Sequence, residues 1–323
     1  MVSDFWEGKR VLVTGATGLI GGPLCKLLLE RGALVTGYDL ETVGTFPAHG
    51  LVGKVPVIQG SILNRSEMEE ALRGEKVCIH LAAISGVEEA RRQGIQAWEV
   101  NVRGTWMLLD ACASTPGVEA FVGASSNHIY GEQGVKPTPE DAPFNQLDTY
   151  SATKAAMDIL IRSYAHNYGL RTAVVRNTNC FGVGDPHTDH IIPGTILSVL
   201  RGEPPIIRSD GTRKKAYLYV NDVAEAYIAV AEWIMGRGYS RPGTAFNVTG
   251  KESISVLDLV KTIISVMGSK VGYTVLGEPN DQSDEALDDT AIQTRVGWRP
   301  KVSLEAGIAK TADWMAKERG VKV

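Results

Sequence analysis

The stretch RVLVTGATGLIGG, residues 10–22, decides the fold of this chain. A short apolar run is followed by glycines at positions 15, 18 and 21, and a helical pattern begins directly after them. Glycine permits a tight turn and a close approach of the backbone, and the free N–H groups at a helix N-terminus attract phosphate. The stretch therefore predicts a strand, a pyrophosphate-binding turn and a helix. By itself the spacing is a weak signal, because a glycine-rich turn often serves only the packing of strand against helix.

A carboxylate at the end of the next predicted strand supports the dinucleotide interpretation. The run LVTGYD, residues 34–39, ends on Asp39, 21 residues after Gly18. A carboxylate at that spacing accepts hydrogen bonds from both hydroxyls of an adenosine ribose and repels a 2′-phosphate. No arginine or lysine lies between Gly32 and Gly53 to bind such a phosphate. We therefore expect NAD rather than NADP, the alternative being that Asp39 is a solvated loop acid.

Alternating strands and helices continue through the first half of the chain. The predicted strands are continuous apolar runs, which is typical of strands buried on both faces of a parallel sheet. They cover residues 10–14, 34–39, 55–59, 77–83, 120–124 and 171–176, and the clearest helices cover 18–31 and 149–168. After residue 176 the pattern breaks into segments rich in Gly, Pro and charge. The sequence predicts a doubly wound α/β (Rossmann) sheet from residues 1–176 and 216–247, with a smaller C-terminal α/β lobe from residues 177–215 and 248–323.

Composition argues against several classes of function. The chain has 323 residues, is 44% hydrophobic and carries a formal net charge of −4, so no basic footprint for nucleic acid or an anionic membrane is visible. No apolar run approaches the roughly 20 residues of a membrane span, and charges come too early for a signal peptide. Four scattered cysteines in apolar contexts predict free thiols and neither disulfides nor zinc. We expect a cytoplasmic protein.

Tyr150 and Lys154 lie four residues apart in TYSATKAAMD, residues 149–158, and so on one face of a predicted helix. A tyrosine with the usual pKa near 10 is ionised to about one part in a thousand at neutral pH, so a catalytic phenolate needs about 4 kcal/mol of stabilisation. We expect Lys154, an oxidised nicotinamide and hydrogen bonds to the phenolate to supply it together. A surface Tyr–Lys pair without chemistry is the alternative.

Polar side chains end another buried strand. In EAFVGASSNHIYG, residues 119–131, an apolar run leads into Ser125, Ser126, Asn127 and His128. Serine and asparagine are ordinary turn residues, so a plain loop explains them equally well unless they face a site.

These motifs together make the chain resemble the extended short-chain dehydrogenase/reductase family, which contains nucleotide-sugar epimerases and dehydratases. The resemblance covers nearly the whole chain. It rests on TGATGLIGG (14–22), HLAA (80–83), VNVRGT around Asn101, SSNHIYG (125–131), YSATK (150–154), RNTNCFG (176–182), IIPG (191–194), RSDGTRKKAYLYVNDVAEA (208–226) and GWRPKVSLEAGI (297–308). The stretch from Tyr150 to Val223 is most similar to the branch of cytidine-diphosphoglucose 4,6-dehydratases.

The resemblance implies roles for individual residues. Tyr150 is the base, Lys154 tunes it and anchors the nicotinamide ribose, and Ser126 relays a proton to the sugar hydroxyl. The residues implied in NAD binding are Gly15, Thr17, Gly18, Leu19, Ile20, Gly21, Asp39, Leu40, Ser61, Ile62, Leu81, Ala82, Ala83, Asn101, Tyr150, Lys154 and Asn177. Those implied in binding a nucleotide-diphosphate sugar are Ser85, Ser126, Asn179, Arg208 and Lys215. No metal is expected.

The expected reaction depends on the two positions after Ser126. Dehydratases of the family usually carry an acidic pair there, or an acid and a lysine, whereas this chain has Asn127 and His128. An amide cannot deliver a proton to a leaving hydroxyl, although a neutral histidine can act as a base or simply be structural. The resemblance therefore favours an NAD-dependent epimerase that acts at C4. A 4,6-dehydratase, a dehydrogenase or reductase, and a non-catalytic NAD-binding regulator are the alternatives.

Several positions depart from the family pattern. Ser61 stands where an aspartate often contacts adenine, and Lys215 replaces a bidentate arginine by a point charge. Residues 277–289 are acidic where a late arginine is usual. The helices expected over 96–114 and 149–167 have apolar faces, which in this family pair across a two-fold axis into the four-helix bundle of a homodimer.

Overall fold

The computed structural model describes residues 5–132, 137–146, 148–236, 239, 241–279 and 284–320. Its main body is a seven-stranded sheet in the order β10-β6-β5-β4-β1-β2-β3, in which every neighbouring pair is parallel. The strands are β1 (Arg10–Thr14), β2 (Leu34–Asp39), β3 (Val57–Gln59), β4 (Val77–His80), β5 (Ala120–Ser126), β6 (Arg171–Asn177) and β10 (Thr244–Val248). The predicted doubly wound parallel sheet is confirmed.

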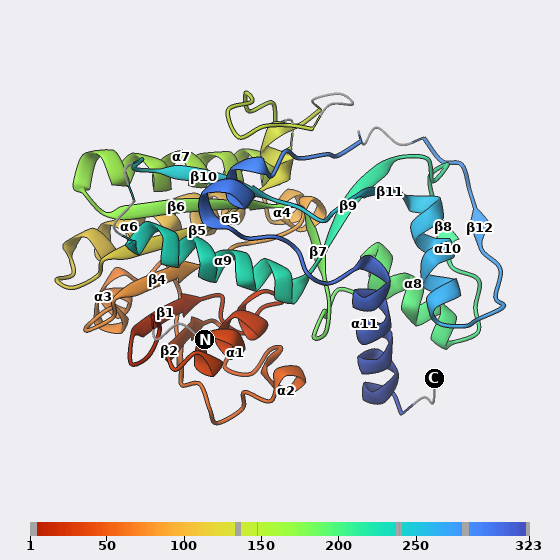
Figure 1. Ribbon diagram of the computed structural model, residues 1–323, viewed down its shortest axis with the longest axis horizontal. Helices are drawn as coiled ribbons and strands as arrows, with labels where there is room; N and C mark the ends of the chain where they lie inside the picture. The colour runs from red at the N-terminus through yellow and green to blue at the C-terminus, as the bar shows by residue number, and fades with distance from the viewer. Residues whose placement is uncertain are drawn as a thin grey trace.

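Helices cover both faces of this sheet (Figure 1). On one face lie α1 (Gly21–Glu30) and α9 (Val220–Met235), and on the other lie α3 (Arg65–Ala71), α6 (Thr105–Ser114) and α7 (Thr149–Tyr168). Shorter elements connect them: α2 (Phe46–His49), α4 (Val87–Gln93), α5 (Ile95–Trp98), the π-helix η1 (Glu99–Gly104) and the 3₁₀-helix η2 (Asn127–Tyr130).

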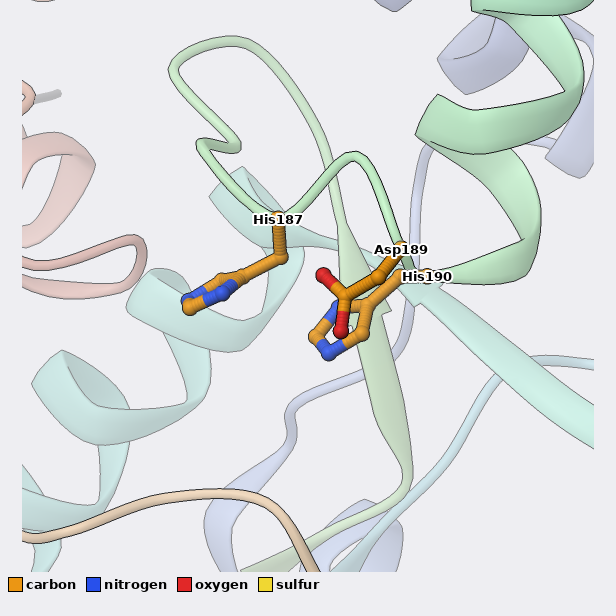
Figure 2. Close-up of side chains that lie close together, drawn as sticks. All are labelled: His187, Asp189 and His190. Atoms are coloured by element: carbon orange, nitrogen blue, oxygen red, sulfur yellow. The ribbon is translucent and has the colours of Figure 1, made fainter. Parts of the chain in front are cut away.

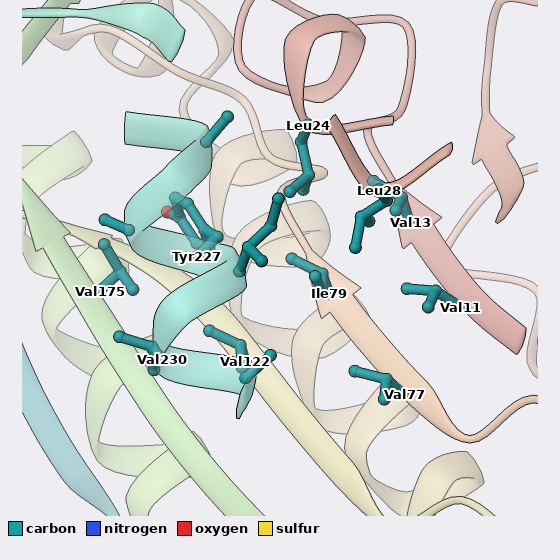
Figure 3. Close-up of a cluster of buried hydrophobic side chains, with 14 of the residues drawn as sticks. Val11, Val13, Leu24, Leu28, Val77, Ile79, Val122, Val175, Tyr227 and Val230 are labelled. Atoms are coloured by element: carbon teal, nitrogen blue, oxygen red, sulfur yellow. The ribbon is translucent and has the colours of Figure 1, made fainter. Parts of the chain in front are cut away.

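Side chains along each strand alternate between two hydrophobic layers. Val11 and Val13 of β1 face α1, where Leu24 and Leu28 complete the layer (Figure 3). Leu12, between them, belongs to the opposite layer with α3, α6 and α7. Burying one aliphatic side chain of this size contributes about 1.5–3 kcal/mol, so strands covered on both faces are apolar throughout.

The second half of the chain adds a smaller lobe with its own core. A three-stranded sheet in the order β11-β9-β7 begins directly after β6, and a two-stranded sheet pairs β12 with β8. The elements are β7 (Asn179–Phe181), β8 (Ile206–Ile207), β9 (Lys214–Tyr219), β11 (Ser253–Ser255), β12 (Thr274–Val275), α8 (Ile191–Leu200), α10 (Val256–Val266), the π-helix η3 (Ile292–Val296) and α11 (Leu304–Glu318). Phe181, Ile196, Ile263 and Ile308 are among the buried residues that join the sheet to α8, α10 and α11.

The chain crosses between the two parts more than once. β9 belongs to the small sheet, and α9 then returns the chain to the large one, where β10 forms the edge. Asp222, in the first turn of α9, is 3% exposed and accepts hydrogen bonds from the backbone N–H groups of Lys301 (3.0 Å) and Val302 (2.8 Å). This carboxylate ties the segment before α11 to the large sheet. The predicted division into two lobes at residues 176, 215 and 247 stays a prediction.

Several element boundaries differ from the expected ones. The third strand begins at Val57 rather than 55, since Pro56 has no N–H for a sheet ladder, and the fourth ends at His80 rather than 83. The first helix begins at Gly21 rather than 18, because the glycine turn precedes it. β5 is longer than expected because Ser126 still pairs with Asn177 of β6.

Two expectations from composition are met within the described ranges. The four cysteines are free thiols, three of them buried and Cys180 half-buried. No helix in the described ranges is both long and apolar enough to cross a membrane.

Candidate active site

The glycine turn after β1 brings backbone segments into closer contact than side chains would allow. Gly15 has φ +70°, and a Cβ atom there would lie 2.7 Å from the backbone nitrogen of Ala82. A Cβ on Gly21 would lie 2.1 Å from the carbonyl oxygen of Gly15. Gly18 is exposed, and a Cβ atom there would lie only 3.3 Å from the carbonyl oxygen of Gly15, so the absence of a side chain leaves the turn open to a ligand. The turn and the start of α1 therefore form the cradle that the spacing predicts for a pyrophosphate.

Asp39 faces this turn from the end of β2. Its Oδ2 accepts hydrogen bonds from the backbone N–H (3.0 Å) and the hydroxyl (2.9 Å) of Thr17, and its Oδ1 accepts one from Leu40 N–H (2.7 Å). The carboxylate is thus fixed beside the cradle, in the position that a ribose contact requires. It is not a free loop acid.

The other residues expected around the adenosine lie close to this turn or on the next loop. Leu19 and Ile20 are half-buried in the turn, and Leu40 is 66% exposed beside Asp39. Ser61 uses its hydroxyl to accept from Leu63 N–H within its own turn. The side chain of Ile62 is buried where a Cβ on Gly104 would touch it, so Ile62 packs against η1.

The loop after β4 is built by hydrogen bonds that the motif did not reveal. Leu81 N–H donates to Thr14 O (3.0 Å) and Ala82 N–H to Thr14 Oγ1 (3.4 Å), so the loop stays beside β1. Leu81, Ala82 and Ala83 are half-buried there. The ring of His80, at the end of β4, is buried, and its Nδ1 lies 2.7 Å from Thr14 Oγ1. Burial, with the charge of Lys154, lowers the pKa of His80 to about 3, so this ring is neutral.

Asn101 supports this loop through its side-chain amide. It is fully buried in η1. Its Oδ1 accepts from Ile84 N–H (2.7 Å), and its Nδ2 donates to Ile84 O (3.0 Å) and Thr153 Oγ1 (2.9 Å). Both amide hydrogens are used within the protein, so Asn101 holds the loop against α7, and the contact with NAD that the resemblance implies for it stays a prediction.

Ser126, Tyr150 and Lys154 come together from β5 and α7. Asp148 caps α7 by accepting from Ser151 N–H (2.9 Å), which places Tyr150 in the first turn and Lys154 one turn later. Tyr150 is hydrogen-bonded to Ser126. Lys154 is 3% exposed, and its ammonium group donates to the carbonyl of Ala124 (3.3 Å) on β5. The pattern therefore predicts the grouping correctly.

Burial disfavours charge on both Tyr150 and Lys154. Burial raises the pKa of Tyr150 to about 12, and the hydrogen bond with Ser126 offsets this only in part. Burial lowers the pKa of Lys154 to about 8. The protein alone does not make the phenol acidic, because the ammonium group of Lys154 is hydrogen-bonded to Ala124 O and desolvation disfavours the charged form of both side chains. Additional positive charge in the site is needed to reach a phenolate.

His128 and Asn127 follow Ser126 in η2. The ring of His128 lies edge-on to that of Tyr150, with 5.8 Å between centroids. Burial lowers the pKa of His128, so its imidazole is neutral at pH 7. Asn127 is 6% exposed, and its Oδ1 accepts a hydrogen bond from Ser126 Oγ (3.4 Å).

A buried ion pair between β6 and α7 supports η2, and the sequence analysis did not predict it. Arg176 on β6 and Asp158 on α7 are both fully buried and share two hydrogen bonds, of 2.7 and 2.9 Å. The same guanidinium donates to Tyr130 Oη (2.6 Å) and Glu140 O (2.7 Å). An arginine in an apolar strand was the available signal, but its partner is 18 residues away on a helix.

Two of the residues expected to bind substrate contact the same carboxylate, and two others are exposed. Asn179 on β7 and Lys215 on β9 converge on the carboxylate of Glu285, at 3.0 Å each. Asn177 ends β6, and its Nδ2 donates to Thr178 O (3.0 Å).

Ser85 and Arg208 are exposed, and their side chains make no hydrogen bond or ion pair with described residues, so their roles stay predictions.

A separate group of potential metal ligands lies on the exposed loop before α8. His187, Asp189 and His190 place ligand atoms within 4.8 Å of one another (Figure 2). The two imidazole rings are stacked, with 4.8 Å between centroids and 26° between planes. Because imidazole lone pairs lie in the ring plane, nearly parallel rings do not direct them at one point. We assign no metal to this group.

Comparison with known proteins places this geometry in a family. The family model described as "NAD dependent epimerase/dehydratase family" matches residues 11–248. The chain belongs to this family. The resemblance to extended short-chain dehydrogenases/reductases is thereby confirmed, and the cofactor is NAD. The glycine cradle, the carboxylate of Asp39 and the Tyr150–Lys154 pair fit that cofactor.

Relatives of the chain differ in reaction. A dTDP-glucose 4,6-dehydratase of Streptomyces griseus is 30% identical over 96% of this chain and 95% of that protein. The crystal structure of a UDP-glucose 4-epimerase of Thermotoga maritima superposes with a TM-score of 0.87 at 28% identity, covering 96% of this chain and 99% of the other.

A trifunctional UDP-glucose 4,6-dehydratase/UDP-4-keto-6-deoxy-D-glucose 3,5-epimerase/UDP-4-keto-L-rhamnose reductase of Arabidopsis thaliana is 28% identical over 96% of this chain. The chain spans 47% of that protein's length. Across these comparisons the family is one of nucleotide-sugar epimerases and dehydratases.

Proposed function

We propose that this chain is an NAD-dependent nucleotide-sugar epimerase that inverts C4 of the sugar through a transient keto sugar. The observation that supports this reaction is the pairing of Asn127. Its amide lies beside Ser126 and donates to the carboxylate of Glu285 (2.9 Å). Loss of water would need a proton donor at position 127. This position instead holds an amide that is hydrogen-bonded to the carboxylate of Glu285.

Tyr150 and Ser126 carry the proton in this proposal. Ser126 hydrogen-bonds the reacting hydroxyl and Tyr150, and Tyr150 takes the proton as the carbon is oxidised. NAD, when bound, accepts the hydride and returns it to the opposite face of the sugar. Since burial raises the pKa of Tyr150 to about 12, the phenolate forms only when positive charge enters the site, which couples proton removal to the oxidised cofactor.

Lys154 contributes charge and position. With a pKa near 8 it is mostly protonated at pH 7, and its ammonium group is held between α7 and β5. From this place it can bind a ribose hydroxyl and keep positive charge within the buried site. Lys154 therefore stabilises the phenolate mainly by binding the cofactor, and less by contacting Tyr150 directly.

The second candidate is a 4,6-dehydratase, which removes water to give a 4-keto-6-deoxy sugar. The position of Glu285 is the observation that favours it. The sequence argument against dehydration considered only the residues at positions 127 and 128, whereas a carboxylate reaches Asn127 from a segment far along the chain. Glu285 has a lowered pKa and is an acceptor only, and His128 is neutral. A base for elimination is thus present, but the acid for the leaving hydroxyl is not found among the described residues that touch Asn127.

Product analysis in D₂O distinguishes the candidates. An epimerase returns the same hydride, so the product is a C4 isomer of unchanged mass without solvent deuterium, and no reduced cofactor accumulates. A dehydratase product lacks one water and carries solvent deuterium at carbon. A dehydrogenase accumulates NADH in proportion to product, and a non-catalytic regulator converts nothing. Loss of water would refute epimerisation.

We also propose that the protein is a homodimer that pairs through α5, η1, α6 and α7. Trp98, Trp106 and Ile159 are 45%, 53% and 58% exposed on this surface. Trp98 and Trp106 line one surface groove together with Val102 and Leu160. Exposed aromatic groups clustered on one face are typical of protein interfaces, and the family resemblance points to a second copy as the partner. Cytoplasmic localisation stays a prediction.

A further inference from the structure

The segment that carries Glu285 is held in place by its backbone. Glu285 N–H donates to Lys214 O of β9 (2.9 Å). Thr138 N–H donates to Ala286 O, and Thr138 O accepts from Asp288 N–H, both at 2.9 Å. The side chain of Glu285 is therefore presented to the site from a fixed backbone.

The carboxylate of Glu285 is one of the most strongly bound groups of the site. Its Oε2 accepts from the amides of Asn127 (2.9 Å) and Asn179 (3.0 Å), and its Oε1 accepts from the ammonium group of Lys215 (3.0 Å). The side chain is 15% exposed. Burial acts to raise its pKa, but the charge of Lys215 and the hydrogen bonds from Lys215 and Asn127 hold the pKa below its usual range, so the group is an anion at neutral pH.

The side chain of Asn127 connects Glu285 to the hydroxyl of Ser126. Asn127 accepts from Ser126 Oγ through Oδ1 and donates to Glu285 through Nδ2. Ser126 is in turn hydrogen-bonded to Tyr150. A sugar whose hydroxyl is held by Ser126 and Tyr150 therefore places neighbouring ring substituents near Glu285.

The positive charge on this side of the site is already paired. Lys215 forms its ion pair with Glu285, 13% and 15% exposed, and His128 is neutral. Arg208 is exposed, and its side chain forms no hydrogen bond or ion pair with these residues among those described. An additional anion placed beside Glu285 would meet a carboxylate and no unpaired cation from these groups.

We propose that Glu285 selects the substrate class: the site takes a nucleotide-linked hexose with neutral hydroxyl or cationic amino substituents near Asn127, and rejects the corresponding hexuronate. This inference rests on the proposed function in that it assumes a nucleotide-sugar substrate. A carboxylate accepts hydrogen bonds from hydroxyl and ammonium groups, whereas two carboxylates in a partly dry site repel each other strongly. Glu285 is then a specificity-determining residue that also positions Asn127.

The test measures binding to the NAD-loaded protein by calorimetry. UDP-, CDP-, GDP- and dTDP-glucose first show which nucleotide binds best, and glucose and glucuronic acid are then compared on that nucleotide. The wild-type protein should bind the glucose form at least about tenfold more tightly. Glu285→Gln, which keeps the shape and removes the charge, should reduce that ratio to below about threefold by improving the glucuronic acid form.

Two variants serve as controls. Glu285→Asp retains the charge and should keep the preference for glucose. Glu305→Gln removes an exposed carboxylate on α11, an element that carries none of the site residues, and should leave the ratio unchanged.

The possible failures are distinguishable. If none of the four nucleotide-glucose compounds binds, the proposed function is overturned and this inference with it. If one binds and its glucuronic acid form binds equally well to the wild-type protein, the proposed function stands and the inference is wrong. The wild-type ratio decides this even if Glu285→Gln fails to fold.

Discussion

Replacing Lys154 by methionine should stabilise the cofactor-free protein while abolishing turnover. Lys154 is 3% exposed, and burial lowers its pKa from 10.5 to about 8. A shift of this size corresponds to about 3 kcal/mol by which the buried charge destabilises the fold. Methionine has a similar length and no charge. It loses the hydrogen bond to Ala124 O, worth about 1 kcal/mol, so a net gain of about 2 kcal/mol is expected at pH 7.

The pH dependence identifies the cause. Between pH 8 and 10.5 the unfolded chain binds more protons at Lys154 than the folded protein, so wild-type stability rises with pH in this window. Below pH 8 the full cost of the buried charge is present. The advantage of Lys154→Met should therefore be largest below pH 8 and disappear toward pH 10.5. Other groups that titrate in this range are shared by both proteins and cancel in the difference.

Urea unfolding followed by circular dichroism measures this difference. It is carried out on cofactor-free protein at pH 7 and again near pH 10, because bound NAD would itself stabilise the fold. Lys214→Met, which removes an exposed lysine on β9, is the matched control and should change stability by less than about 0.5 kcal/mol. A destabilised Lys154→Met variant, or a gain that is the same at both pH values, would refute the reasoning.

Three further changes test the site, its support and the proposed dimer. Tyr150→Phe keeps the ring and removes the proton acceptor, so NAD should remain bound while turnover falls at least about 100-fold; product formation near the wild-type rate contradicts the assigned base. Asp158→Ala leaves Arg176 buried without its carboxylate and should cost about 3–5 kcal/mol in urea unfolding. Glu88→Ala, in an exposed ion pair, should cost less than about 1 kcal/mol, and equal losses would contradict this. Trp106→Glu should yield monomers in analytical ultracentrifugation, whereas a persisting dimer would exclude this face.

The cofactor-binding half of the site was predictable because its signals are local. Glycines 15, 18 and 21 and Asp39 act within one strand–turn–helix–strand unit, where chain geometry decides which atoms meet. The spacing of Tyr150 and Lys154 works for the same reason, since one helical turn separates them. Each of these predictions depends on few residues and short separations.

Other features of the site depend on segments that are distant in the sequence. Glu285 reaches Asn127 across 158 positions. The acidic stretch 277–289 was visible, but which of its carboxylates enters the site was not. The amide of Asn101 joins Ile84 to Thr153, and the motif around Asn101 did not indicate these contacts.

The sequence by itself determined the parallel sheet, the phosphate cradle and the identity of the catalytic triplet, because apolar periodicity and short spacings follow directly from backbone geometry. Only the tertiary structure decided the charge state of the site. The pKa values of Tyr150, Lys154 and Glu285 depend on burial and on partners from other elements, and both are consequences of packing. For that reason the family could be recognised from the residues, whereas the proposed choice of substrate rests on a carboxylate that folding brings to Asn127.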